Sequence, residues 1–254
     1  MLLESKGNKM VDDKKTHFGY KKISENEKAP KVKAVFNSVA GKYDLMNNLM
    51  SMGLHKVWKK ILIESASLKK NAKILDIASG TADLAIALSK KNKNFEIYQT
   101  DINLSMIKEG QKKLIDNGIV MPSITCDAEA LPFPSNYFDC VTISFGLRNM
   151  TKKDCALKEI YRVLAPGGKV LILEFSEIYK PLRKLYDLYS FKLVPKLGKL
   201  FANDEESYKY LVESIRVHPN QEQLLSLMEE QGYKKTSFLN LTAGVVAIHK
   251  GFKF

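Results

Sequence analysis

Acidic side chains stand at or near the ends of three successive apolar stretches, as Asp76, Asp101 and Asp127. After the first, the chain turns through the small residues 78–82 before a helix-like stretch begins. Small side chains let backbone N–H groups approach a bound molecule, and a helix N-terminus favours negative charge. A carboxylate about twenty residues beyond such a turn can accept hydrogen bonds from ribose hydroxyls. The pattern predicts a nucleoside site.

The sequence of this turn does not match the patterns of phosphate-binding loops. A G-x-G-x-x-G fingerprint around Gly80 would need glycine where Ala78 and Asp83 stand, and a carboxylate at the third position disfavours the pyrophosphate of NAD or FAD. The lysine of a Walker loop is absent as well. Thr81 stands where a hydroxyl can cap the helix or bond a ligand carboxylate. A lone Asp at a strand end is as often a cap or turn residue, but three in register are harder to explain in that way.

Apolar runs alternate with amphipathic stretches from Lys73 onward, which predicts an α/β fold: a doubly wound, mainly parallel sheet with helices on both faces. After residue 176 the pattern becomes helical and aromatic, and the C-terminus looks like a closing strand pair that adds an antiparallel strand. The expected strands are 73–78, 95–102, 123–128, 138–145, 169–175, 234–241 and 243–252. The expected helices are 81–91, 105–117, 152–164 and 220–232, and the APGG at 165–168 is expected to stop the third and turn the chain into the next strand.

One large domain is expected over residues 34–254, with cap helices at 34–70 and a lid insertion at about 177–218. Residues 1–33 are polar and lysine-rich, and the segment SENEKAPK within them is interpreted as a loop, so this part is expected to be a basic arm. The formal net charge of +12 favours an anionic partner: nucleic acid, a phosphorylated substrate or an acidic lipid surface.

Cysteine usage and the N-terminus bear on the compartment. The three cysteines have no metal-like spacing and cannot all pair, which is typical of reduced thiols in the cytosol. The N-terminus lacks the apolar core of a signal peptide, and no apolar run is long enough to span a bilayer. We therefore expect a cytoplasmic protein that can still lie on the inner face of the cytoplasmic membrane.

The layout resembles the class I S-adenosylmethionine-dependent methyltransferases, whose fold is Rossmann-like. The resemblance implies that the small-residue turn holds the methionine part of S-adenosylmethionine, Asp101 the ribose and Asp127 the adenine, with the backbone N–H of Ala128 beside it. The residues expected to bind the cofactor are Asp76, Gly80, Thr81, Asp101, Asp127, Ala128 and Ser144.

Nucleic-acid methylation is disfavoured in spite of the charge. Enzymes that methylate base amines usually carry an acidic or Asn residue, two prolines and an aromatic after the fourth strand, where this chain reads ISFGLRN. Cytosine-C5 enzymes need a cysteine after a proline, and none of the three cysteines follows one. An RNA methyltransferase therefore remains the second enzyme hypothesis, supported by net charge alone.

Two long segments narrow the family, YDLMNNLMSMGLHKVW (43–58) and RVLAPGGKVLILEFS (162–176). Shorter matches are THFGY (16–20), AEALPFP (128–134), SFGLRN (144–149) and the tail NLTAGVVAIHKGFKF. From about Met10 to the C-terminus the chain closely resembles the bacterial ubiquinone/menaquinone biosynthesis C-methyltransferases. It departs from them at Ser79 and Ala82, where the family turn usually has more glycine, and at Ala165, where a basic residue is usual.

The resemblance implies C-methylation of prenylated quinols: demethylmenaquinol and the methoxylated benzoquinol that precedes ubiquinone. Losing a hydroxyl proton pushes charge onto the ring carbon that takes the methyl group, so a residue must stabilise that loss. Arg148 is expected beside a quinol oxygen, although it can equally tie a loop to a carboxylate. Asn149 can orient the same oxygen, and Tyr43 and His55 are further candidate catalytic or pocket residues.

The sequence also bears on membrane, metal and protein partners. Across residues 180–200, basic side chains interleaved with apolar ones face a single acid, Asp187, which predicts either a membrane-binding surface or an ordinary lid helix. The histidines lack ligand spacing, so no metal is expected. A quinone-biosynthesis assembly, a homodimer and a cofactor-binding scaffold without catalysis are left open.

Overall fold

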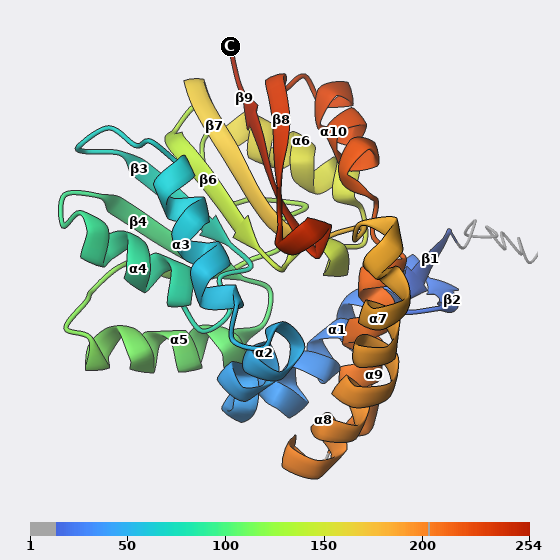
Figure 1. Ribbon diagram of the computed structural model, residues 1–254. Coiled ribbons are helices and arrows are strands. Elements are labelled where there is room, and N and C mark those ends of the chain that lie inside the picture. The colour runs from blue at the N-terminus through green and yellow to red at the C-terminus, as the bar shows by residue number, and fades with distance from the viewer. Residues whose placement is uncertain (1–13, 203) are drawn as a thin grey trace, which may run out of the picture.

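The computed structural model describes residues 14–202 and 204–254. Its centre is a seven-stranded sheet in the order β5-β4-β3-β6-β7-β9-β8 (Figure 1). Five neighbouring strands, from β5 to β7, are parallel, and β9 runs antiparallel between β7 and β8. This confirms the predicted sheet with its antiparallel C-terminal strand. The strands are β3 (Lys73–Ile77), β4 (Glu96–Asp101), β5 (Ser123–Thr125), β6 (Phe138–Ser144), β7 (Leu164–Phe175), β8 (Lys234–Leu241) and β9 (Val246–Phe252).

Two hydrophobic cores lie on opposite faces of the sheet, because successive side chains of a strand point to opposite sides. Along β3, Ile74 belongs to the core shared with α3 and α4, whereas Leu75 and Ile77 belong to the core shared with α6 and α10. Asp76 therefore alternates onto the α3 and α4 side. The helices around the sheet are α3 (His55–Ser65), α4 (Asp83–Lys91), α5 (Leu104–Asp116), α6 (Lys153–Val163) and α10 (Gln221–Glu230).

The switch point of the sheet lies between β3 and β6. From β3 the chain adds β4 and β5 on one side, then returns to add β6 and β7 on the other. Ligands of doubly wound sheets bind outside the carboxyl ends of the strands at this point. The ends of β3, β4, β5 and β6 therefore define where a site can form.

The APGG segment makes no separate turn after α6. Helix α6 ends at Val163 and the extended β7 begins at the next residue, with residues 165–168 inside a register shift against β6. A Cβ on Gly168 would lie 2.7 Å from the carbonyl oxygen of Ala165 and 3.0 Å from that of Phe138. Glycine at this position lets the bulged strand stay paired to its neighbour.

The segment SENEKAPK is helical, so its interpretation as a loop was wrong. Strands β1 (Lys15–Phe18) and β2 (Lys21–Ser24) form a hairpin, and α1 (Glu25–Val39) follows at once. Ser24 and Glu27 form a capping box, in which Glu27 accepts the Ser24 backbone N–H over 3.1 Å. This signature favours a helix start even though Pro30 lies within the helix. Residues 1–13 of the expected arm lie outside the described residues.

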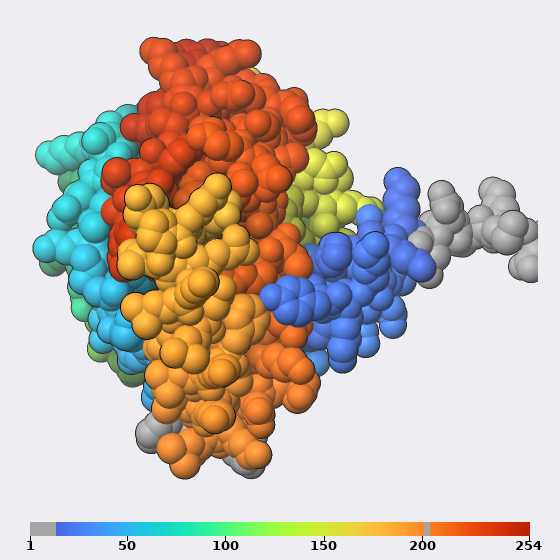
Figure 2. All heavy atoms as spheres, turned by 45° about the vertical axis from the view of Figure 1, so that its right-hand side comes forward, coloured from blue at the N-terminus to red at the C-terminus, as the bar shows by residue number. Residues whose placement is uncertain are grey.

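A helical lid follows β7 in the chain and precedes α10, and it lies beside α1 and α2 (Tyr43–Ser51) (Figure 1). Gly198 of this lid packs against Tyr208, where an added Cβ would lie 2.4 Å from the ring. Figure 2 shows the lid as one continuous orange face with the blue N-terminal segment next to it. The lid consists of a 3₁₀ turn (Lys180–Leu182), α7 (Arg183–Asp187), a π-helical turn (Leu188–Leu193), α8 (Val194–Ala202) and α9 (Glu205–Arg216).

Candidate functional site

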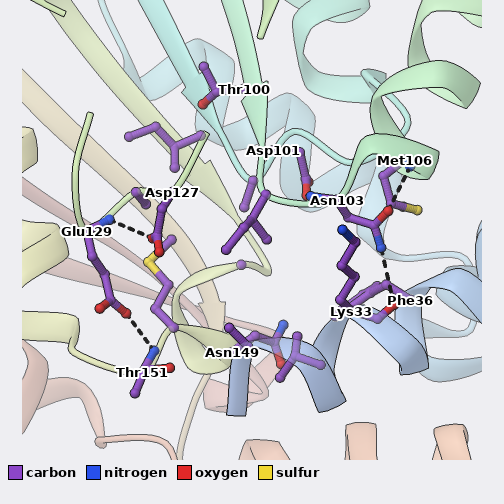
Figure 3. A pocket seen from close by; sticks show the side chains of 18 of the residues that line it. Lys33, Phe36, Thr100, Asp101, Asn103, Met106, Asp127, Glu129, Asn149 and Thr151 are labelled. Atoms are coloured by element: carbon purple, nitrogen blue, oxygen red, sulfur yellow. Dashed lines mark hydrogen bonds between the residues drawn. The ribbon is translucent and has the colours of Figure 1, made fainter. Parts of the chain in front are cut away.

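A cavity of about 300 Å³ opens at the carboxyl ends of the central strands. Its walls come from the residues that follow β3, β4, β5 and β6, and α1 closes it from the opposite side (Figure 3). Of the residues predicted from sequence, the cavity brings together six. They are Tyr43, Gly80, Asp101, Asp127, Ala128 and Asn149.

Asp101 connects the end of β4 to the turn after β3. One carboxylate oxygen accepts the Gly80 backbone N–H over 3.0 Å, and the other accepts that of Asn103 over 2.8 Å. Burial raises the pKa of Asp101 to about 6, although these N–H groups act in the opposite direction. Each carboxylate oxygen has a further lone pair, so Asp101 can still accept hydrogen bonds from a ligand.

Asp127 lies at the cavity wall beside Glu129 (Figure 3), and Ala128 lines the cavity as well. Its Oδ1 accepts the backbone N–H of Glu129 over 2.9 Å, and Glu129 accepts that of Thr151 over 2.9 Å. Within the described residues Oδ2 of Asp127 makes no hydrogen bond. The chain thus holds this carboxylate with one acceptor oxygen available to a ligand.

Tyr43 of α2 covers the turn at Gly80. Gly80 has φ +56°, and a Cβ on it would lie 3.5 Å from the Tyr43 hydroxyl and 3.4 Å from Met106. Burial raises the pKa of Tyr43, so its hydroxyl stays protonated at neutral pH. Glycine at this position therefore serves both the left-handed backbone and the close approach of α2.

Helix α1 supplies a wall that the sequence reasoning missed, because its first residues were assigned to a loop. Lys28 ties the helix to the loop after β6 by donating to the carbonyl of Met150 over 3.0 Å, and the Asn103 amide donates to the carbonyl of Lys33 over 3.3 Å. The capping box at Ser24 is the signal that would have found this helix. The cavity-lining residues of α1 are Glu25, Asn26, Ala29, Val32, Lys33 and Phe36.

The turns after β3 and β6 touch each other directly at the cavity wall. Ala78 has φ +52°, a conformation that costs an L-residue about 1 kcal/mol or more. A Cβ added to Gly146 would lie 2.4 Å from the Cβ of Ala78. The separation of these two turns, and with it the cavity, depends on the absence of a side chain at residue 146.

Asp76, Thr81 and Ser144 do not line the cavity. Asp76 is buried, accepts the Thr142 hydroxyl over 2.8 Å and has its second oxygen unpaired within the described residues. Thr81 accepts a hydrogen bond from Lys113 over 3.1 Å, and α4 carries no side-chain cap. The hydroxyl of Ser144 is buried without a partner among the described residues.

Arg148 forms a buried ion pair instead of facing the cavity. Its guanidinium bonds Glu174 over 2.9 Å, with the two side chains 3% and 1% exposed, and it also donates to Ser214 and to the carbonyl of Phe145. Its backbone N–H donates to the second oxygen of Glu174 over 3.1 Å. Of the two roles that the sequence left open, the contacts are those of an arginine that ties a loop to a carboxylate.

His55 lies apart from the other predicted site residues. It lines a second cavity between α3 and α4, and its Nδ1 lies 2.9 Å from the hydroxyl of Ser51. Burial and the nearby Lys59 lower its pKa to about 4. The side chain is therefore neutral at pH 7, and it does not line the cavity that holds Tyr43.

Comparison with known proteins identifies the family of this chain. The model of the ubiE/COQ5 methyltransferase family matches residues 22–253. The chain belongs to this family. It is 56% identical over 243 residues to a ubiquinone/menaquinone biosynthesis C-methyltransferase UbiE of Chromobacterium violaceum, covering 95% of this chain and 100% of that one. A protein of the same name from Nitrosospira multiformis is 55% identical over 240 residues, covering 94% and 98%.

Solved structures agree with this family member in fold. A SAM-dependent methyltransferase from Aquifex aeolicus superposes with a TM-score of 0.56 at 15% identity, covering 76% of this chain and 88% of that one. Phosphoethanolamine N-methyltransferase 2 of Haemonchus contortus, in complex with S-adenosylhomocysteine, gives a TM-score of 0.59 at 17% identity, covering 77% and 52%. The class I methyltransferase fold predicted from the sequence is thereby confirmed.

The contact between Ala78 and Gly146 can be tested by a compensating pair of substitutions. We expect Gly146→Ala to weaken S-adenosylhomocysteine binding at least about tenfold, because the new Cβ pushes the two turns apart. Adding Ala78→Gly removes the opposing Cβ, so the double variant should recover most of the affinity. Calorimetric titration of the three proteins measures this, and a double variant as weak as Gly146→Ala would contradict the proposed contact.

The burial of Asp76 should make the stability of the protein depend on pH. Burial raises the pKa of Asp76 to about 7. Above pH 7 the buried carboxylate is ionised, which lowers the free energy of unfolding. This cost is lost as the pH falls from 7 towards 4, because the folded protein then holds the carboxyl group in its neutral form. Asp76→Asn should raise the free energy of unfolding at pH 8 by about 2 kcal/mol, with a smaller gain at pH 5. Urea unfolding at both pH values tests this, with the exposed Asp116→Asn as the matched control. An equal gain at both pH values would show that the charge is not responsible.

Proposed function

We propose that this chain methylates a ring carbon of prenylated quinols in ubiquinone or menaquinone biosynthesis, within the cavity beyond β3, β4, β5 and β6. S-Adenosylmethionine is the cofactor of this family member. The proposed substrate class rests on sequence identity: more than half of the residues are identical to those of relatives named for that reaction, over nearly their whole length. The cavity supports it by placing nucleoside-type acceptors on one wall and Asn149 on another.

The residues present fit S-adenosylmethionine. Asp101 and Asp127 each retain a free acceptor site, which suits ribose hydroxyls and the adenine amino group respectively. Apolar side chains such as Ile102 and Met106 also line the cavity and suit the apolar parts of the cofactor. Gly80 itself carries no side chain that could obstruct the methionine part. When bound, the cofactor supplies a methyl group on a positively charged sulfur.

The residues of the chain can favour the loss of a quinol proton. Asn149 lines the cavity and can donate its amide N–H to a quinol oxygen, where negative charge develops as the proton leaves. Arg148 acts indirectly, because its pairing with Glu174 holds the short helix Leu147–Asn149 in place. Tyr43, Phe36 and Phe145 add aromatic walls that exclude water.

The decisive experiment is methyl transfer from labelled S-adenosylmethionine to demethylmenaquinone and to the demethylated methoxybenzoquinone, each with and without a reductant. We expect product only under reduction, because the electron-rich quinol is the form that can be methylated on carbon. The preferred ring identifies the pathway. Cofactor binding without product on either reduced ring would contradict the proposal and favour a scaffold without catalysis.

The role of Asp127 predicts a change of base preference. In Asp127→Asn, the amide oxygen keeps the bond to the Glu129 N–H, so the NH₂ group faces the base. We expect S-adenosylhomocysteine to bind about tenfold more weakly, because the amide NH₂ group of the variant then faces the adenine amino group, and both are hydrogen-bond donors. S-Inosylhomocysteine, which carries an acceptor oxygen at the same position, should lose much less affinity. Equal losses for both ligands, measured by calorimetry, would remove Asp127 from the base site.

We also propose that the lid lies on an anionic membrane. No helix among the described residues is long and apolar enough to cross a bilayer. The lid instead exposes apolar side chains, including Leu185 at 69% and Leu200 at 74%, as well as lysines such as Lys184. Such a surface suits contact with acidic headgroups. The basic residues of this stretch are Lys180, Arg183, Lys184, Lys192, Lys196 and Lys199.

Flotation with vesicles containing acidic phospholipid tests the lid surface. A variant with glutamine at positions 184, 192 and 196 should float at least about tenfold less, because each lysine contributes about 1 kcal/mol near such a membrane. Glutamine at the exposed Lys93, Lys108 and Lys158 removes the same charge from outside the lid. Equal loss in both triple variants would show a response to net charge only.

A further inference from the structure

The side-chain amide of Asn149 is held from outside the cavity. The hydroxyl of Tyr210, on α9 of the lid, donates to Oδ1 of Asn149 over 3.0 Å. Asn149 lines the cavity (Figure 3), and its amide nitrogen makes no hydrogen bond within residues 14–202 and 204–254. Because the two branches of an amide point in different directions, holding the oxygen towards the lid leaves the NH₂ group for the cavity.

Tyr210 is itself fixed in place. Its ring stacks on Phe18 of β1, with centroids 4.1 Å apart and planes inclined by 18°. The residue is 5% exposed, and burial raises the pKa of its phenol, so the hydroxyl stays a donor at neutral pH. A stacked ring of this kind has little freedom to turn its hydroxyl away from Asn149.

The turn of the β1–β2 hairpin fits α9 closely, which places Phe18. Gly19 has φ +56°, and a Cβ on it would lie 2.2 Å from the carboxylate of Glu213. The backbone N–H of Tyr20 donates to the same carboxylate over 3.1 Å. The motif THFGY thus gains a structural explanation that the cavity itself does not provide: it holds the hairpin against the helix that carries Tyr210.

We propose that Tyr210 is a positioning residue of the methyl-transfer site, which turns the Asn149 amide so that its N–H faces the quinol oxygen that becomes negative. This inference rests on the function proposed above. A reversed amide would present its oxygen lone pairs to a developing phenolate and repel it. The β1–β2 hairpin, nearly two hundred residues earlier in the chain, supports this arrangement through Phe18.

The kinetic test compares two tyrosines of the same helix. Tyr210→Phe removes the hydroxyl that orients Asn149, and we expect kcat for a reduced demethylated quinol to fall about tenfold with the cofactor Kd within twofold. Tyr208→Phe is the matched control, because Tyr208 is also buried and its hydroxyl has no partner among the described residues. It should keep kcat within twofold.

A double-substitution cycle separates orientation from packing. Asn149→Ala removes the group that Tyr210 is proposed to orient, so Tyr210→Phe should lower kcat by less than twofold in that background. The proposal is overturned if Tyr210→Phe costs as much without Asn149 as with it, if Tyr208→Phe lowers kcat equally, or if Tyr210→Phe keeps the wild-type kcat.

A readout without turnover distinguishes this inference from the proposed function. The side-chain amide resonances of Asn149, assigned with Asn149→Ala, should shift or broaden in Tyr210→Phe and stay in place in Tyr208→Phe. Unchanged Asn149 resonances in Tyr210→Phe overturn the orienting role whatever the activity. A wild-type protein that shows the expected resonance changes but no methyl transfer would contradict the function and leave the orienting contact established.

Discussion

The buried pair of Arg148 and Glu174 is the interaction on which the site depends most. Burying two charges is costly, and removing either partner leaves the other uncompensated, so the pair is kept together. Here it connects the loop after β6 to the end of β7, and the backbone N–H of Arg148 adds a second bond to the same carboxylate. Gly146 and Asn149 flank the pair along the chain, and both form the cavity wall. The Arg148 guanidinium, which does not face the cavity, thereby fixes the neighbouring residues that do.

The two ends of the cavity are built in different ways. The cofactor end uses strand ends, where backbone register sets the positions of Asp101 and Asp127 and carboxylates accept neighbouring N–H groups. The end with Asn149 is closed by α1 and α2, whereas α9 holds Asn149 from outside the cavity, and these helices reach the site by side-chain contacts rather than by sheet hydrogen bonds. Strand register tolerates little displacement, whereas packed helices can shift, so access to the cavity depends on the helical end.

Sequence patterns predicted the sheet, its closing strand pair and the carboxylates Asp101 and Asp127, because strand ends and turn residues leave a local signal. Asp76 shares that local pattern, but one residue of strand alternation turns it towards the α3 and α4 layer, and only the three-dimensional sheet reveals this. The contacts of Arg148 and Tyr210 join residues 26 and 61 positions apart in sequence, which no local pattern encodes. The helix α1 was predictable from its capping box, and Pro30 obscured it.

The placement of the N-terminal hairpin has a consequence for the order of folding. Tyr20 bonds Glu213 across 193 positions, and Lys28 bonds Met150 across 122. During synthesis the hairpin and α1 are made well before α9, the helix on which they dock. Contacts this distant in sequence form late, because closing such loops costs entropy before any contact repays it. The N-terminal hairpin and α1 can therefore dock only after α9 has been made, and until then the chain exposes the apolar face of α1 to other proteins.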